Sequence, residues 1–168
     1  ARAQRQDLAK EVPDPFVMTE KELLTGIDQR LKQAETDLEA GLFLRALGHT
    51  KQIQHDATTV QNLITAVGAH EKRQAQMTSL IEQGYRPENL ETNQQEVATD
   101  LKTIRQALVE GDYAAAIPWI EEFTADSERT LTDVQAWQSL HEQNSQALAQ
   151  LDQELARVTA YHQKKVTP

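Results

Sequence analysis

The chain has no cysteine among its 168 residues. Disulfide bonds, thiolate nucleophiles and cysteine-ligated zinc are therefore excluded, although a chain of this length can bury a core without such cross-links. A helical protein needs no disulfides in an oxidising or a reducing compartment, so the absence of cysteine leaves the compartment open.

Glycine and proline are also scarce, with six and five copies, and several of them stand at breaks in the apolar pattern. The intervals between these breaks are rich in Gln, Glu, Ala and Leu, a composition typical of long helices. The sequence therefore predicts an all-α protein.

Positive charge is in deficit, because 17 Lys and Arg face 26 Asp and Glu for a formal net charge of −9. An anionic surface repels phosphate backbones and anionic lipid headgroups, so we expect no nucleic-acid partner. Apolar runs such as residues 114–117 are far shorter than the roughly 20 residues of a membrane span, so we expect no span in this chain. The chain begins at Ala1 rather than Met, so we expect either a processed product or a piece of a longer protein, and the unpaired ends of the repeat described below favour the piece.

The first half of the chain predicts a short and a long helix. Residues 19–22 form a capping box, and apolar residues then recur at helical spacing until Gly41, which indicates a helix over 19–40. A second periodic run ends at the breaker of residues 84–87, which indicates a helix over 42–83.

The second half predicts another short and long helix. A periodic run over 89–110 stops at Gly111, and Asp112 is suited to cap a last helix that runs toward His162. Pro118 falls in the second turn of this last helix, where we expect a local kink.

The sequence repeats its apolar pattern after about 70 residues. So many coincidences without a gap, including both glycine breaks, indicate a structural repeat of one short and one long helix. The matched positions are Ile27 with Val97, Leu31 with Leu101, Leu38 with Leu108, Gly41 with Gly111, Ala46 with Ala116, Ile53 with Phe123, Ile64 with Val134 and Val67 with Trp137.

The links between the helices fix the expected topology. Tight reversals fold each short helix onto the first half of the following long helix, and the turn near Gly84 reverses the chain again. We therefore expect antiparallel hairpins and three-helix bundles in two repeats of about 70 residues with long shared helices. The predicted division is a stub or linker over 1–18, a first repeat over 19–87 and a second over 88–168.

Both ends of this arrangement lack a packing partner. Residues 2–12 look like the end of a preceding long helix, and the last helix carries an apolar seam that no third repeat covers. We therefore expect an excerpt of a longer array, or a protomer that binds a protein partner or a second copy through the second half of its last helix. The residues of that seam are Leu148, Leu151, Leu155 and Val158.

Long helices shared between successive three-helix bundles resemble spectrin-type repeats, and the shorter period is similar to the repeats of the bacterial septation-ring regulator and other membrane-tethered helical rods. The stretch Leu-x-x-Gly-Asp-Tyr-x-x-Ala at 108–116 also resembles the turn of tetratricopeptide repeats, but those repeat after about 34 residues. The spectrin-like resemblance implies a scaffold in an extracytoplasmic or membrane-associated location, and it carries no catalytic residues.

Metal and catalytic motifs are missing. A di-metal bundle site uses Glu-x-x-His pairs, and no acid precedes any histidine by three positions; no His-Glu-x-x-His and no glycine-rich phosphate loop occurs either. We expect no catalytic, cofactor-binding or metal-binding residues, and predict that the chain is not an enzyme. The five histidines are His49, His55, His70, His141 and His162.

Both long helices become polar at the same place in the repeat, at Glu71 and Gln74 and at His141 and Asn144. These residues form either a buried polar layer that binds a ligand or fixes helix register, or a seam that turns to solvent between bundles.

Two tryptophans lie on the same face of the last helix, 18 residues apart. We expect Trp137 to pack in the core, since its repeat mate is Val67, and Trp119 to contact a partner.

Two functions fit these patterns. The first is a non-catalytic helical scaffold or interaction module that is part of a larger protein, for which the resemblance to membrane-tethered rods also implies a tether. The alternative is an extracytoplasmic bundle that senses a ligand in the polar layer.

Overall fold

The computed structural model describes residues 18–166, and all regular structure in this range is α-helical. The prediction of an all-α protein is therefore confirmed. The expected helix stub over residues 2–12 lies outside the described residues. The four helices are α2 (Glu20–Glu39), α3 (Phe43–Glu82), α4 (Leu90–Val109) and α5 (Tyr113–Val166).

Local capping explains where the helices begin and end. The Thr19 hydroxyl accepts a hydrogen bond from the backbone N–H of Glu22, whose carboxylate accepts one in return from the N–H of Thr19, so α2 begins with a complete capping box. The carboxylate of Asp112 accepts a hydrogen bond from the N–H of Ala115 at 3.0 Å and caps α5. Gly41 and Gly111 both adopt positive φ, 71° and 76°, and end the short helices in the same way.

The helix bounds repeat after 70 residues. The short helices begin at 20 and 90 and end at 39 and 109, and the long helices begin at 43 and 113. The two turns also share their hydrogen bonds, because the N–H of Gly41 reaches the carbonyl of Leu38, and that of Gly111 the carbonyl of Leu108, both at 3.0 Å. We call α2 with the first half of α3 the first hairpin, and α4 with the first half of α5 the second hairpin.

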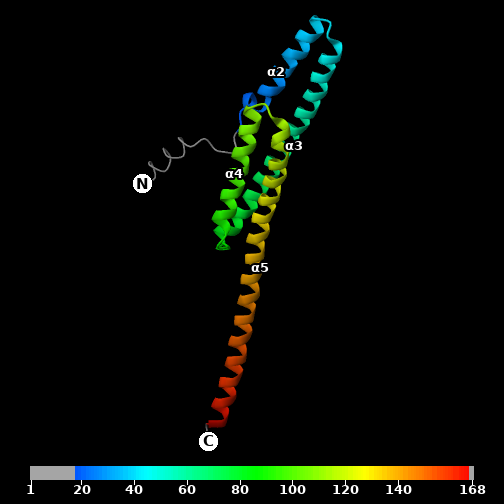
Figure 1. Cartoon of the computed structure of the whole chain (residues 1–168). Coiled ribbons are helices and arrows are strands. Elements are labelled where there is room, and N and C mark those ends of the chain that lie inside the picture. The colour runs from blue at the N-terminus through cyan, green and yellow to red at the C-terminus, as the bar shows by residue number, and fades with distance from the viewer. Residues whose placement is uncertain (1–17, 167–168) are drawn as a thin grey trace, which may run out of the picture.

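The second half of α3 packs against the second hairpin (Figure 1). Its apolar side chains join those of α4 and α5 in one buried cluster, and Met77, Leu90 and Val134 form a smaller one beyond it. The long helix α3 therefore contributes to both halves of the molecule. The larger cluster consists of Val60, Leu63, Ala66, Val97, Leu101, Ile104, Leu108, Tyr113, Ala116, Ile120 and Phe123.

The start of α2 closes over the turn of the second hairpin. The hydroxyl of Tyr113 donates a hydrogen bond to the carbonyl of Leu23 at 3.0 Å and accepts from the N–H groups of Gly26 and Ile27. Arg105 on α4 adds a bond to the Glu22 carboxylate at 2.8 Å. The first hairpin is thereby joined to the second by direct contacts as well as by α3.

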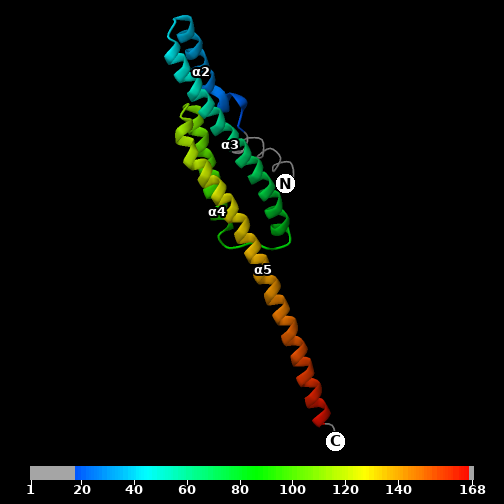
Figure 2. The same cartoon turned by 90° about the vertical axis from the view of Figure 1, so that its right-hand side faces the viewer.

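The helix α5 runs on alone beyond the bundle (Figures 1 and 2). It continues through Pro118 as one helix of 54 residues, and every side chain over 141–163 is exposed. None of the helices in the described range has the combined length and apolar character needed to cross a lipid bilayer.

Candidate functional site

The four polar positions that the two long helices share are not buried in one layer. Glu71, Gln74, His141 and Asn144 are all exposed. Glu71 lines a hollow beside the start of α2, whereas Gln74 lines a different one against α4. The ring of His141 stacks edge-on against Tyr85, with 5.6 Å between the ring centroids. These four side chains therefore do not line one ligand pocket.

The residues expected to contact a partner lie on the surface. Trp119 is 37% exposed, and Trp137 is 39% exposed, so the prediction that Trp137 packs in the core is wrong. Trp137 stands where α5 leaves the bundle, so fewer neighbours cover it than cover its repeat mate Val67 on α3. The seam residues of the tail, Leu148, Leu151, Leu155 and Val158, are exposed as well.

These tail residues continue the face of α5 that is buried in the bundle. The buried positions and the exposed tail positions follow one another in steps of three and four residues, which is the spacing of a helix seam that packs against other helices. Only the neighbours differ along its length. The buried members are Tyr113, Ala116, Ile120, Phe123, Ser127, Thr130 and Val134, and the seam then passes through Trp137, His141 and Asn144 to the tail.

The first hairpin and the next turn of α3 present a second uncovered apolar face. Leu31, Leu38, Phe43 and Ile64 are between 49% and 69% exposed. Their counterparts 70 residues later, Leu101, Leu108, Tyr113 and Val134, are at most 1% exposed. The same repeat positions are thus apolar in both hairpins, but within the described residues only the second hairpin has a long helix to cover them.

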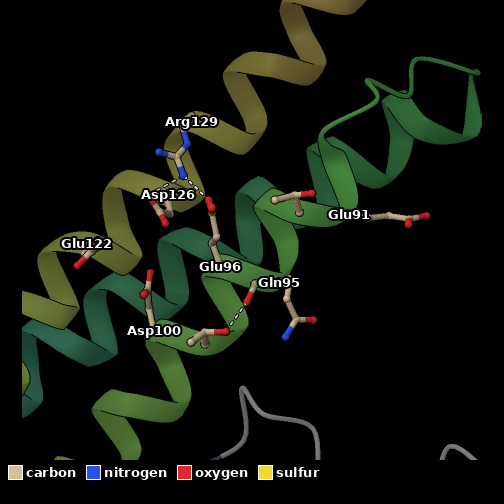
Figure 3. Close-up of a pocket in the computed structure, with 9 residues that line it drawn as sticks. Glu91, Gln95, Glu96, Asp100, Glu122, Asp126 and Arg129 are labelled. Carbon is tan, nitrogen blue, oxygen red and sulfur yellow. Dashed lines mark hydrogen bonds and ion pairs between the residues drawn. The ribbon is translucent and has the colours of Figure 1, made fainter.

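A polar hollow of about 620 Å³ lies between α4 and α5 (Figure 3). Its wall contains five carboxylates and a single guanidinium, together with Thr92, Gln95 and Thr99. We call it the acidic pocket. The carboxylates belong to Glu91, Glu96 and Asp100 on α4 and to Glu122 and Asp126 on α5, and the guanidinium belongs to Arg129.

Asp100 is the most buried of these acids. Its side chain points from α4 toward α5, between Glu96 and Glu122 (Figure 3), although the residue is only 5% exposed. One of its carboxylate oxygens, Oδ2, is buried and accepts no hydrogen bond. Burial, followed by the charges of Asp126, Glu122 and Glu96, raises the pKa of Asp100 to about 6, while Arg129 opposes the shift.

Arg129 neutralises the pocket only in part. Its guanidinium lies 2.5 Å from the Glu96 carboxylate and 3.1 Å from that of Asp126. Glu91 is paired with Arg86, at 2.6 Å, outside the pocket. The pocket therefore keeps an excess of negative charge around Asp100, which attracts cations.

The sequence patterns missed this pocket because its acids come from two helices separated in the chain. No set of three His, Asp or Glu side chains converges as metal ligands among the described residues. A signal was nevertheless present at one repeat position, where the first repeat has Arg30 and the second has Asp100.

Comparison with known proteins adds no relative, since no family model, no curated protein and no solved structure matches the chain. The function is therefore inferred from the chain's own geometry.

Proposed function

We propose that this chain is a non-catalytic helical scaffold of two spectrin-like repeats that self-associates end to end. The second half of α5, residues 138–166, packs on the uncovered face of the first hairpin of another copy. The observation that carries this proposal is the seam of α5, which continues from the buried bundle into Leu148, Leu151, Leu155 and Val158, all more than half exposed. Apolar seams of this length rarely remain in water.

The chain itself supplies the template for this contact. Residues 63–82 of α3 lie on the second hairpin, and the residues 70 positions later, 133–152, belong to α5. Met77 of α3 packs with Val134, and their repeat mates are Ala147 in the tail and Ile64 in the first repeat. The turn of the tail that contains Ala147 and Leu148 would therefore lie beside Ile64 of the next copy. Both Leu148 and Ile64 are at least half exposed, and the contact would bury them.

Such a contact joins two different surfaces, the tail of one copy and the first hairpin of the next. An association of this kind does not close on itself and extends into a rod. The alternative of a ligand bound in the polar layer has less support, because the four residues of that layer are exposed and line no common pocket.

Sedimentation velocity over a concentration series tests the proposal. The unaltered chain should gain mass with concentration, whereas Leu148→Glu with Leu155→Glu should remain monomeric with unchanged helicity, because both side chains are exposed. Gln146→Glu with Gln153→Glu is the matched control, since it adds the same charge on another face of the tail. An equal loss of association in both variants would indicate general repulsion and not loss of the seam.

A mixing experiment separates the end-to-end contact from pairing of two tails. A copy with Leu38→Glu and Phe43→Glu keeps its tail, and a copy with Leu148→Glu and Leu155→Glu keeps its first hairpin. The two copies should each be monomeric alone and form a one-to-one dimer when mixed. Tail-to-tail pairing predicts instead that the hairpin variant still dimerises alone and that mixing adds nothing.

A further inference from the structure

We propose that the acidic pocket between α4 and α5 binds an organic cation of the ammonium or guanidinium class. This inference does not depend on the proposed function, because the pocket shares no residue with the tail or with the uncovered face of the first hairpin.

The first step is the state of Asp100. An acid that is 95% buried, with one oxygen that accepts no hydrogen bond, is costly unless a donor or a positive charge reaches it. The single cation of the pocket, Arg129, is engaged by Glu96 and Asp126. The pocket therefore has unused capacity to accept hydrogen bonds at the point where Asp100 faces α5 (Figure 3).

The second step is the same place in the first repeat. Arg30 occupies the position of Asp100, and Asp56 that of Asp126, 70 residues earlier. The guanidinium of Arg30 forms an ion pair with Asp56, which is fully buried, and the amide of Gln52 donates to the same carboxylate at 2.9 Å. Gln52 in turn corresponds to Glu122 in the acidic pocket.

This comparison shows that a hairpin of this fold can hold a guanidinium beside the acid of its long helix. In the first repeat the guanidinium of the short helix pairs with the buried acid of the long helix and also reaches the Gly111 carbonyl at 3.4 Å. The second repeat has a carboxylate in place of this guanidinium and a further acid in place of Gln52. A cation from outside the chain would restore in the second repeat the charge arrangement that the first contains. Such a group would donate to Asp100, Glu122 and Asp126.

The chemistry favours an organic cation over a metal ion. The carboxylates are spread along the pocket, and no three of them converge as ligands within the described part of the chain. The hollow of about 620 Å³ is open to solvent and has room for several donors on one chain. Ammonium and guanidinium groups occur both in free amines and in Lys and Arg side chains of proteins.

Calorimetric titration with spermidine and agmatine at low ionic strength tests the proposal. Binding should be at least tenfold weaker for Asp100→Asn and lost for Asp100→Arg, which places in the pocket the cation that the first repeat has. Glu142→Gln is the control, because it removes one exposed acid outside the pocket, and its affinity should stay within twofold. Circular dichroism establishes that each variant is folded.

A second arm identifies the source of the cation. A capped alanine peptide with one central Lys or Arg is titrated beside the two free amines. Tighter binding of the amines assigns the pocket to a small free cation, and tighter binding of the peptide assigns it to a partner's side chain; either result supports the proposal. No binding of any probe would overturn it, as would equal affinity for the unaltered chain and Asp100→Arg, since the latter indicates attraction to the net charge alone.

Discussion

Gly26 lies where α2 crosses the turn of the second hairpin. A Cβ atom at this position would approach the Cα of Gly111 to 2.9 Å and the ring of Tyr113 to 2.6 Å. A neighbouring backbone atom cannot give way as a flexible side chain can, so the two helices would have to separate. Because Gly26 has no side chain, α2 can lie close to Gly111 and Tyr113 of the second hairpin.

We predict that Gly26→Ala destabilises the fold by on the order of 1–3 kcal/mol, as overpacking does, despite the better helix propensity of alanine. The matched control is Gly68→Ala, where a Cβ would meet nothing within 4 Å in the middle of α3. That variant should gain about 0.5–1 kcal/mol. Urea denaturation of both variants measures the difference, and a stabilised Gly26→Ala would show that the two backbones are not in contact.

Asp100 gives the stability a defined pH dependence. Its pKa is raised from 3.8 to about 6, so the folded state binds a proton more tightly than the unfolded state between these values. The folded state therefore loses stability as the pH rises from about 4 to about 6, and the penalty is complete above this window. His70 acts in the opposite direction, because burial, followed by the charge of Arg73, lowers its pKa and stability is lost as the pH falls below 6.5.

We predict that Asp100→Asn raises the free energy of unfolding by on the order of 1–3 kcal/mol at pH 7 and changes it little at pH 4. Thermal melts of both proteins from pH 4 to pH 7.5 measure this difference directly, since the contribution of His70 is common to both and cancels. A difference that is constant across the range would mean that Asp100 is not desolvated in the folded protein.

The helix α5 combines two environments in one element. Its first half is packed between α3 and α4, whereas its side chains over 141–163 are exposed. Isolated helices gain little stability from propensity alone, so the second half should open readily in a single copy.

Hydrogen exchange followed by mass spectrometry should therefore show fast exchange of the α5 amides beyond residue 141 in dilute solution and slow exchange within the bundle. At concentrations at which copies associate, the tail should become protected, and Leu148→Glu with Leu155→Glu should abolish this protection. Slow exchange of the tail in a dilute monomer would show that the helix needs no partner.

The helices themselves were predictable from the sequence. The capping box at Thr19, the glycine breaks at Gly41 and Gly111 and the cap at Asp112 are local signals, and the predicted bounds agree with the observed ones to within one residue. The exception is the end of α5 at Val166, four residues past His162, where no glycine or proline stops the helix earlier.

Exposure along the seam was less predictable. Trp137 and the polar residues near it occupy seam positions on α5, but whether a seam residue is buried depends on the neighbouring helix, which the residue's own spacing does not reveal. The acidic pocket was missed for a related reason, because Asp100 and Asp126 meet only through the packing of α4 on α5. Comparing the two repeats position by position would have shown that the second repeat has Asp100 where the first has Arg30.

At the scale of the whole molecule, α3 ties the two hairpins together. It runs unbroken from the turn of the first hairpin to the base of the second, and the start of α2 is bonded to Tyr113 and Arg105 across the junction. The two hairpins are therefore joined both by a continuous helix and by direct hydrogen bonds.

Because α5 extends far beyond the bundle, a change of its direction at the base moves its far end by a larger distance. About 40 Å of helix follows residue 140, since each residue adds about 1.5 Å. The direction of this arm is fixed only at its base, where α5 packs against α3 and α4 beside the acidic pocket. A cation bound in the acidic pocket would draw α4 and α5 together and tilt α5 slightly at its base. Such a tilt would displace the far end of α5 by several ångströms.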